Sequence, residues 1–151
     1  MIIFILRHAD RIQEDDLSTK GRDRAQLLAR MLYGSGVSIA YRSDTMRARQ
    51  TLEPLKEVLG SKLQVETIGI TTPATPSGHV KKIVDAIKAL PSDKVVVVVS
   101  HSNTVGSIVE GLGGKPGAPI GDNEFDRLFI LARTQTMLTD GVQIRFGEPT
   151  P

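Results

Sequence analysis

The chain alternates short apolar runs with segments in which apolar residues recur every three or four positions. This alternation is typical of α/β domains, where strands and helices follow one another. Strands are expected at residues 2–6, 37–41, 63–67, 95–99, 127–132 and 142–146. Residues 95–99 are five consecutive valines, and a strand that is apolar at every position is buried on both faces. This strand should lie centrally in a mostly parallel sheet, as should residues 2–6.

The segments between the strands predict four helices, which are expected to start at or directly after Ser18, Ser43, Ser77 and His101. Ser18 and Ser43 are favourable N-caps, and Gly34 is expected to end the first helix in a left-handed conformation. Residues 122–146 lack a helical period and are predicted to form two strands joined by a turn. Residues 148–151 are expected to be a frayed tail.

These elements define the expected fold class, which is α/β in three layers. A mostly parallel central sheet carries helices on both faces and ends in a C-terminal antiparallel edge. Hydrophobic residues make up 40% and charged residues 24% of the 151 positions, which is ordinary for a globular protein. No internal repeat, linker or low-complexity segment divides the chain. The simplest interpretation is one domain over residues 1–151.

The composition excludes several classes of function. The chain has no cysteine, which removes disulfides, thiolate metal sites and a cysteine nucleophile. A net charge of +2 and an aromatic share of 4% give neither a basic stripe nor a stacking platform, so no nucleic-acid partner is expected. The apolar start of the chain is too short for a signal peptide or a membrane span. We therefore expect a cytoplasmic protein without a membrane partner, while its oligomeric state stays open.

Two of the three histidines directly follow predicted central strands, His8 after Arg7 and His101 after the valine strand. A third strand leads into the helix expected at Ser43, and Arg47 lies near the first turn of that helix. A cation at this end of a helix opposes the macrodipole, so its presence suggests a bound anion. Ligands of open parallel sheets bind at the carboxyl ends of the strands. The two histidines and two arginines are therefore expected to meet there.

This set of side chains suits a phosphate group. Forked guanidinium donors match phosphate oxygens, and an imidazole can donate a hydrogen bond or attack phosphorus. Backbone N–H groups after His101, starting at Ser102, should add donors at the start of the fourth helix. No metal-binding motif is present and two arginines would repel a cation, so neither a metal nor another cofactor is expected. The remaining histidine, His79, is assigned to the surface.

Four segments of the chain form a recognisable series, namely LRHAD, LSTKGRDRAQLLARML, SDTMRARQT and VVVVSHSNTVGSIVEGLGG. They resemble the histidine phosphatase superfamily, the phosphoglycerate-mutase-like fold, and FDRLFIL is similar to a late strand of that family. They occur in the family's order through most of the chain. The resemblance implies that His8 is the nucleophile and becomes phosphorylated. It also implies that Arg7, Arg47 and His101 bind the phosphoryl group, without a metal.

The sequence thus predicts a metal-independent phosphatase that hydrolyses a phosphomonoester or a phosphoramidate through a phosphohistidine on His8. Its substrate would be a small phosphorylated molecule or a phosphoprotein. Two alternatives stay open. One is a phosphotransferase of the phosphoglycerate mutase type, and the other is a catalytically weak module that binds phosphate or a phosphoprotein.

In one place the chain departs from the family pattern. Many members supply a carboxylic acid that protonates the leaving group, either after the third strand or directly after the second histidine, but here Ser102 follows His101. Asp10, Asp122 and Glu124 are the candidates, and each is expected to be solvated. An alkyl phosphate needs its leaving oxygen protonated, whereas a phosphoramidate leaves more easily. An open site like that of the short bacterial phosphohistidine phosphatases is therefore favoured.

Overall fold

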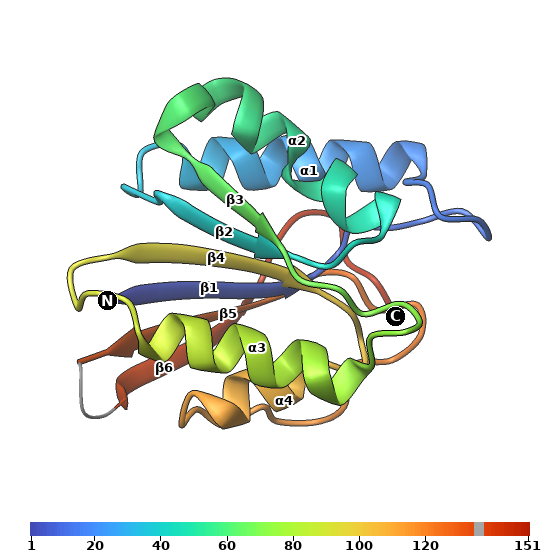
Figure 1. Cartoon of the computed structure of the whole chain (residues 1–151). Coiled ribbons are helices and arrows are strands. Elements are labelled where there is room, and N and C mark those ends of the chain that lie inside the picture. The colour runs from blue at the N-terminus through green and yellow to red at the C-terminus, as the bar shows by residue number, and fades with distance from the viewer. Residues whose placement is uncertain (135–137) are drawn as a thin grey trace.

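A computed structural model of the protein describes residues 1–134 and 138–151. Along the chain it forms β1 (Ile2–Arg7), α1 (Thr19–Leu32), β2 (Ile39–Arg42), α2 (Met46–Leu59), a 3₁₀ turn (Gly60–Lys62), β3 (Gln64–Thr67), α3 (Pro76–Lys88), β4 (Val95–Ser100), α4 (Val105–Gly111), β5 (Arg127–Arg133) and β6 (Leu138–Arg145). Figure 1 shows these elements as one sheet between two helical layers. Each of the six expected strands is present, with bounds that differ by a few residues.

The sheet has the strand order β3-β2-β4-β1-β5-β6. Strands β1 to β4 run parallel to one another. Strand β5 pairs antiparallel with β1, and β6 pairs antiparallel with β5. The valine strand β4 lies between β2 and β1, in the middle of the parallel part. The predicted fold class is therefore confirmed, including the antiparallel C-terminal edge.

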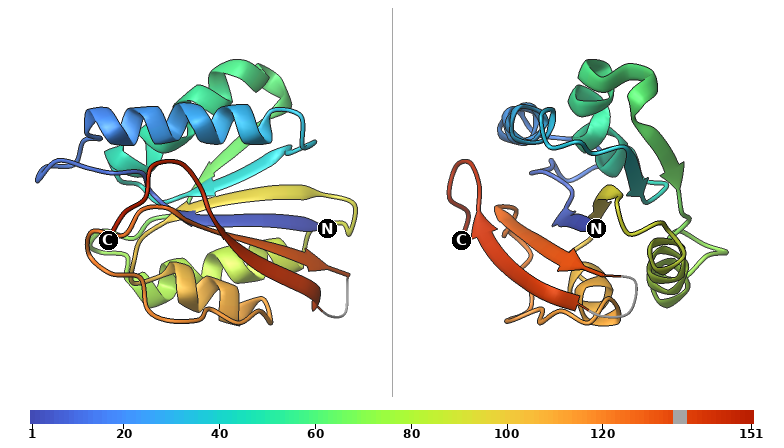
Figure 2. Two further views of the ribbon diagram at one scale, coloured as in Figure 1. Left: turned by 180° about the vertical axis from the view of Figure 1, so that it is seen from behind. Right: turned by 90° about the vertical axis from the view of Figure 1, so that its left-hand side faces the viewer.

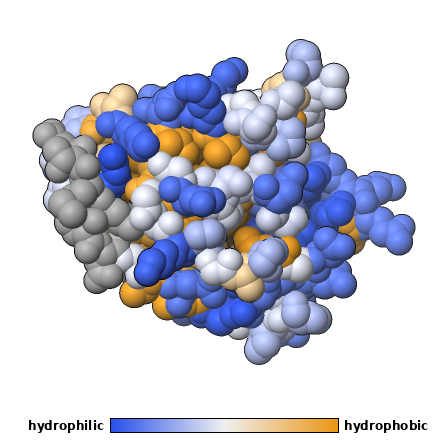
Figure 3. Space-filling view, turned by 90° about the horizontal axis from the view of Figure 1, so that it is seen from below, coloured by the Kyte–Doolittle hydropathy of each residue, from blue (hydrophilic) through white to orange (hydrophobic). Residues whose placement is uncertain are grey.

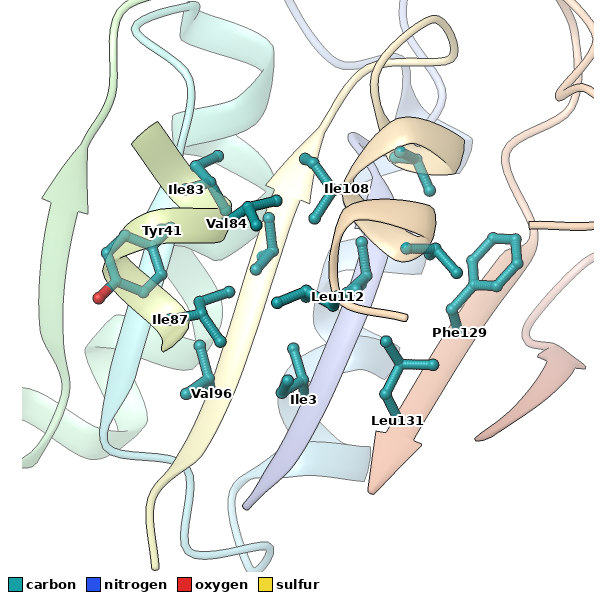
Figure 4. Close-up of a cluster of buried hydrophobic side chains, with 14 residues drawn as sticks. Ile3, Tyr41, Ile83, Val84, Ile87, Val96, Ile108, Leu112, Phe129 and Leu131 are labelled. Atoms are coloured by element: carbon teal, nitrogen blue, oxygen red, sulfur yellow. The ribbon is translucent and has the colours of Figure 1, made fainter. Parts of the chain in front are cut away.

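Helices cover both faces of the sheet (Figure 2). On one face, α1 and α2 pack their leucines against Val97 and Val99 of β4. On the other face, α3 and α4 pack isoleucines and valines against Val96 and Val98, and Figure 4 shows side chains such as Ile87 and Ile108 directed at the strands. Alternate valines of one strand thus belong to two separate cores, which is why β4 is apolar at every position. Among the described residues, no helix has the length and apolar character needed to cross a membrane.

The helix boundaries differ from the sequence prediction in several places. Ser18 is the N-cap of α1, as expected, and its hydroxyl accepts from the N–H of Gly21. Gly34, however, is not a left-handed cap. The C-cap of α1 is Tyr33, in a right-handed conformation, and the glycine with positive φ in the following turn is Gly36. The other three N-caps are Thr45, Thr75 and Thr104 rather than Ser43, Ser77 and His101.

The C-terminal segment is docked against the domain, so the prediction of a frayed tail was wrong. Thr150 donates from its hydroxyl to the carboxylate of Asp126 at 3.0 Å and accepts from the N–H of Phe125 at 2.9 Å. The guanidinium of Arg24 on α1 donates to the carbonyl of Glu148 at 2.7 Å. The guanidinium of Arg24 thus satisfies a backbone carbonyl of the tail, and the tail's own threonine hydroxyl satisfies a backbone N–H of the domain.

Arg24 also forms a buried ion pair with Asp10, at 2.6 Å between Nε and Oδ2. The two side chains are 2% and 9% exposed. Asp10 is therefore not solvated, contrary to the sequence prediction. The pair ties α1 to the loop that follows β1, where His8 lies.

We expect Arg24→Ala to lower the free energy of unfolding by about 3–5 kcal/mol, because removing one partner leaves a buried carboxylate uncompensated. Urea denaturation measures this value. Arg22→Ala is the matched control on the same helix. Its ion pair with Asp16 is about half exposed on both sides and should contribute about 0–1 kcal/mol. Equal losses in the two variants would contradict the role given to the buried pair.

Candidate active site

The parallel register brings three strand ends to one edge of the sheet. Arg7 is paired with Ser100 across β1 and β4, and the N–H of His8 donates to the carbonyl of Ser100 at 2.9 Å. His8 and His101 therefore leave the sheet side by side, with ring centroids 5.2 Å apart. Both rings are buried. Arg47 reaches the same place from α2, so the four predicted residues do converge.

The ring of His8 has a defined orientation. Its Nδ1 lies 2.9 Å from the carbonyl oxygen of Ala9, which can only accept, so Nδ1 carries the proton. The other nitrogen, Nε2, accepts a hydrogen bond from Nε of Arg47 at 3.2 Å. The N–H of Ala9 in turn donates to the hydroxyl of Thr51 on α2, which holds this loop. The unshared electron pair of Nε2 therefore faces Arg47, at the centre of the site.

Arg47 lies in the first turn of α2, as predicted, and Asp15 holds it there. The carboxylate of Asp15 accepts from Nη1 of Arg47 at 2.9 Å and from the backbone N–H groups of Met46 and Arg47. Asp15 thus offsets the unfavourable position of a cation at a helix N-terminus. Burial alone would raise the pKa of Asp15, but these hydrogen bonds lower it, so the carboxyl is ionised. Sequence reasoning missed this residue, because its loop comes from a distant part of the chain.

His101 is held by Ser43. Its Nδ1 lies 3.4 Å from Nη2 of Arg47, which can only donate, so the proton of neutral His101 is on Nε2. That Nε2 donates to the hydroxyl of Ser43 at 2.7 Å. The sequence assigned Ser43 to a helix cap, whereas the structure buries it completely beneath the histidine. The spacing of Ser43 four residues before Arg47 gave no sign of this contact.

Arg7 is anchored on the loop before β5. Its Nη1 donates to the carbonyl oxygens of Gly121, Asp122 and Glu124, at 2.9–3.0 Å. Its guanidinium lies 4.0 Å from the ring centroid of Phe125, a cation–π contact. Its Nε is buried and has no hydrogen-bond partner within the described part of the chain. A buried donor without an acceptor is costly, and an anionic ligand would supply that acceptor.

Burial shifts the protonation equilibria of the site. It lowers the pKa of His8 to about 3. The hydrogen bond to the Ala9 carbonyl raises this pKa, and charge repulsion from His101, Arg7 and Arg47 lowers it further. Burial also lowers the pKa of His101 to about 4, and the charge of Arg47 is the next largest cause. Burial lowers the pKa of Arg7 to about 10. At neutral pH both histidines are therefore uncharged and the arginine is charged. His8 is then available as a nucleophile.

His79 is buried rather than on the surface, so its sequence assignment was wrong. Its Nδ1 lies 2.9 Å from the carbonyl of Ile68, and its Nε2 lies 2.8 Å from the hydroxyl of Ser100. The Ser100 hydroxyl also contacts the hydroxyl of Thr104, which accepts from the N–H of His101 at 3.1 Å. Burial lowers the pKa of His79, as it does for the other histidines. His79 therefore supports the backbone of the second site histidine from below.

Ser102, predicted as a phosphate contact, is partly exposed in the turn before α4. That helix starts three residues later than expected, at Val105, so the N–H of Ser102 is not part of a helix N-terminus. Within the described chain, this N–H forms no hydrogen bond, and its contact with phosphate stays a prediction. Nor do the described residues contain a group of three or more histidine, aspartate or glutamate side chains placed to hold a metal ion.

The three candidate acids have different surroundings. Asp10 is paired with Arg24, and Glu124 accepts from Arg127 at 3.1 Å and from Arg145 at 2.7 Å. Burial alone would raise the pKa of Glu124, but these two hydrogen bonds lower it. The prediction that Glu124 is solvated was therefore wrong. Asp122 is exposed, as expected.

Comparisons with known proteins agree with this fold. The family model of the histidine phosphatase superfamily (branch 1) matches residues 3–68. The structure of the protein histidine phosphatase SixA complexed with tungstate is 27% identical, with a TM-score of 0.72 over 96% of this chain and 97% of that chain. A mycobacterial glucosyl-3-phosphoglycerate phosphatase complexed with VO₃ is 16% identical, with a TM-score of 0.66 over 96% of this chain and 98% of that chain. No curated protein sequence matched the chain.

The predicted resemblance to the histidine phosphatase superfamily is therefore confirmed by the family match and by the phosphatases whose structures the chain is similar to. Among these enzymes, the chain is similar over almost its whole length to the phosphohistidine phosphatase SixA.

The lowered pKa values predict the pH behaviour of the site. A histidine is protonated below its pKa, so His8 and His101 should stay neutral down to about pH 5 instead of titrating near 6.5. Histidine NMR resonances between pH 8 and pH 5 measure this directly. Below about pH 6.5 the unfolded chain binds these protons, whereas the folded chain does not. The free energy of unfolding should therefore decrease as the pH is lowered below 6.5. A titration midpoint near 6.5 for His8 would contradict the assigned environment.

Proposed function

We propose that this protein is a metal-independent phosphatase that transfers a phosphoryl group from its substrate to Nε2 of His8 and then to water. The observation that carries the proposal is the unprotonated Nε2 of His8, buried between Arg47, His101 and Arg7. It combines a nucleophile with cationic donors at one point. Phosphoryl transfer needs mainly positioning and neutralisation of charge, and this arrangement supplies both.

In the first step, the electron pair of His8 Nε2 forms the N–P bond while the bond from phosphorus to the leaving atom breaks. The leaving atom keeps that bond's electron pair. The ring then carries a positive charge, which the hydrogen bond from Nδ1 to the carbonyl of Ala9 stabilises. In the second step, the oxygen of a water molecule attacks phosphorus and the N–P bond breaks. Nε2 recovers its electron pair, and phosphate and a proton leave.

Arg47 and Arg7 neutralise the phosphoryl oxygens. Nε of Arg47 donates to the attacking nitrogen, so an entering phosphoryl group would take over this donor. The unpaired Nε of Arg7 is a second donor, and three carbonyls and Phe125 already hold the guanidinium in place. Tungstate, present in the SixA structure, is an oxyanion like phosphate. An oxyanion would satisfy both arginines at once.

The carboxylates near the site favour a substrate whose leaving group needs no strong acid. Asp15 and Glu124 have lowered pKa values, and Asp10 is locked by Arg24. An alkoxide is a poor leaving group without a proton donor. An imidazole is a good one, because its conjugate acid has a pKa near 6.5. We infer that the substrate is a phosphoramidate, and phosphohistidine on a protein is the class that the similarity to SixA supports.

We expect a radiolabelled phosphohistidine substrate to leave label on the protein that is stable in alkali and lost in acid. His8→Ala should remove this label and lower kcat by about a thousand-fold or more, because the nucleophile is gone. A chelator should change neither result. Arg22→Ala, on the exposed face of α1, is the control. Full activity in His8→Ala would overturn the mechanism.

The same experiments separate the two alternatives. A phosphotransferase of the mutase type would isomerise a phosphorylated acid without net release of phosphate. A binding module would retain phosphate or a phosphoprotein without turnover. Steady release of inorganic phosphate excludes both.

The choice of leaving group gives a second prediction. A general acid contributes typically a hundred-fold or more, so kcat/KM for a phosphohistidine peptide should exceed that for an alkyl phosphate by about a hundred-fold or more. Steady-state kinetics with both substrates measures the ratio. A higher kcat/KM for the alkyl ester would show that a carboxylic acid serves the site after all, and Asp122 would then be the first residue to replace.

A further inference from the structure

A groove lies beside the site, between α4 and the segment 116–120, and we call it the α4 groove. It encloses about 290 Å³ and is lined by Gly106, Ser107 and Glu110 on the α4 side and by Phe129 of β5. Figure 3 shows the face of the molecule that carries α3 and α4, where hydrophobic residues are exposed between hydrophilic ones.

Each wall of the groove has one end next to a residue of the phosphate site. The α4 wall starts at Ser102, directly after His101, and the other wall ends at Ile120, directly before Gly121. The carbonyl of Gly121 accepts from Arg7 at 3.0 Å. A substrate whose phosphoryl group lies between His101 and Arg7 therefore has the groove as the continuation of its binding site.

Two buried arginines hold the wall formed by residues 116–120 in place. Arg127, which is 5% exposed, donates from Nη2 to the carbonyls of Pro116 at 3.2 Å and Ala118 at 2.8 Å. Arg7 holds the adjoining residues 121–124 through their carbonyls. The groove is thus formed before a ligand arrives, which removes the cost of ordering a loop on binding.

The lining indicates what fits the groove. Gly106, Gly117 and Ala118 leave room for the main chain and side chains of a ligand. Glu110 is the charged residue of the lining, it is exposed, and it forms no ion pair within the described part of the chain. An unpaired carboxylate in the lining of a largely apolar groove matches a ligand that has an apolar stretch and a cation. A polypeptide segment with a lysine or arginine has that chemistry.

We propose that the α4 groove binds the polypeptide segment next to the phosphorylated residue of a protein substrate, and that Glu110 selects a basic residue in it. This inference rests on the proposed function of the site. Glu110 lies on the order of 10 Å from His101, since a helix rises about 1.5 Å per residue. An extended peptide covers about 3.3 Å per residue, so the basic side chain lies about three residues from the phosphorylated one.

The test uses peptides with one phosphohistidine and either lysine or glutamate three residues away, on each flank in turn. On one flank, the intact protein should show a kcat/KM about two- to five-fold higher for the lysine peptide at low salt, the range expected for an exposed charge pair. Glu110→Lys should reverse this preference, and Glu110→Gln should remove it. Glu57→Lys makes the same change of charge on the exposed side of α2. It should keep the preference and the activity.

The outcomes separate this inference from the proposed function. Turnover of both peptides with a ratio that Glu110→Lys leaves unchanged overturns the inference, while the phosphatase function stands. Faster turnover of a small phosphoramidate than of either peptide also overturns it, because the groove would then serve a small leaving group. Absence of turnover with every phosphoramidate overturns the function and the inference together. A reversed preference in Glu110→Lys with retained preference in Glu57→Lys supports both.

Discussion

The hydrogen bond from the N–H of His8 to the carbonyl of Ser100 is the contact on which the site depends. It extends the parallel register of β1 and β4 by one residue beyond the sheet, so that the two histidines emerge beside each other. The pairing itself rests on strands that are apolar on both faces and need a helical layer on each side. Burial of valine and isoleucine side chains thus determines where the imidazoles meet, although no apolar residue takes part in the chemistry.

Some charged side chains around the site hold the fold together, and others are available to bind an anion. Asp10 and Glu124 are occupied by Arg24, Arg127 and Arg145, which hold loops and the C-terminal segment together. Asp15 is occupied by the arginine that it positions. Arg7 is held by neutral carbonyl groups and an aromatic ring, so its charge is not cancelled by a carboxylate bonded to it. The site is therefore buried and carries a net positive charge, which a bound oxyanion would neutralise.

The sequence predicted the strands, the layers and the convergence of the four site residues, because these follow from continuous apolar runs and from the geometry of parallel sheets. It did not predict contacts in which a polar side chain reaches across the fold. Ser43 was taken as a cap because serine is a good one, yet its hydroxyl binds His101 and Thr45 caps the helix. His79 was placed on the surface because nothing local shows that its ring meets Ser100. Such choices depend on which distant partner is available, and a local pattern does not contain that information.

The docked tail gives the active site a remote component. Thr150 binds the N–H of Phe125, and the ring of Phe125 lies against Arg7 and 5.8 Å from the centre of the His8 ring. Replacing Thr150 would remove the hydroxyl that holds the backbone of Phe125, and with it a support of the aromatic ring that covers the guanidinium. A substitution at position 150 would therefore reach the site arginine through Phe125, although the two positions lie at opposite ends of the chain.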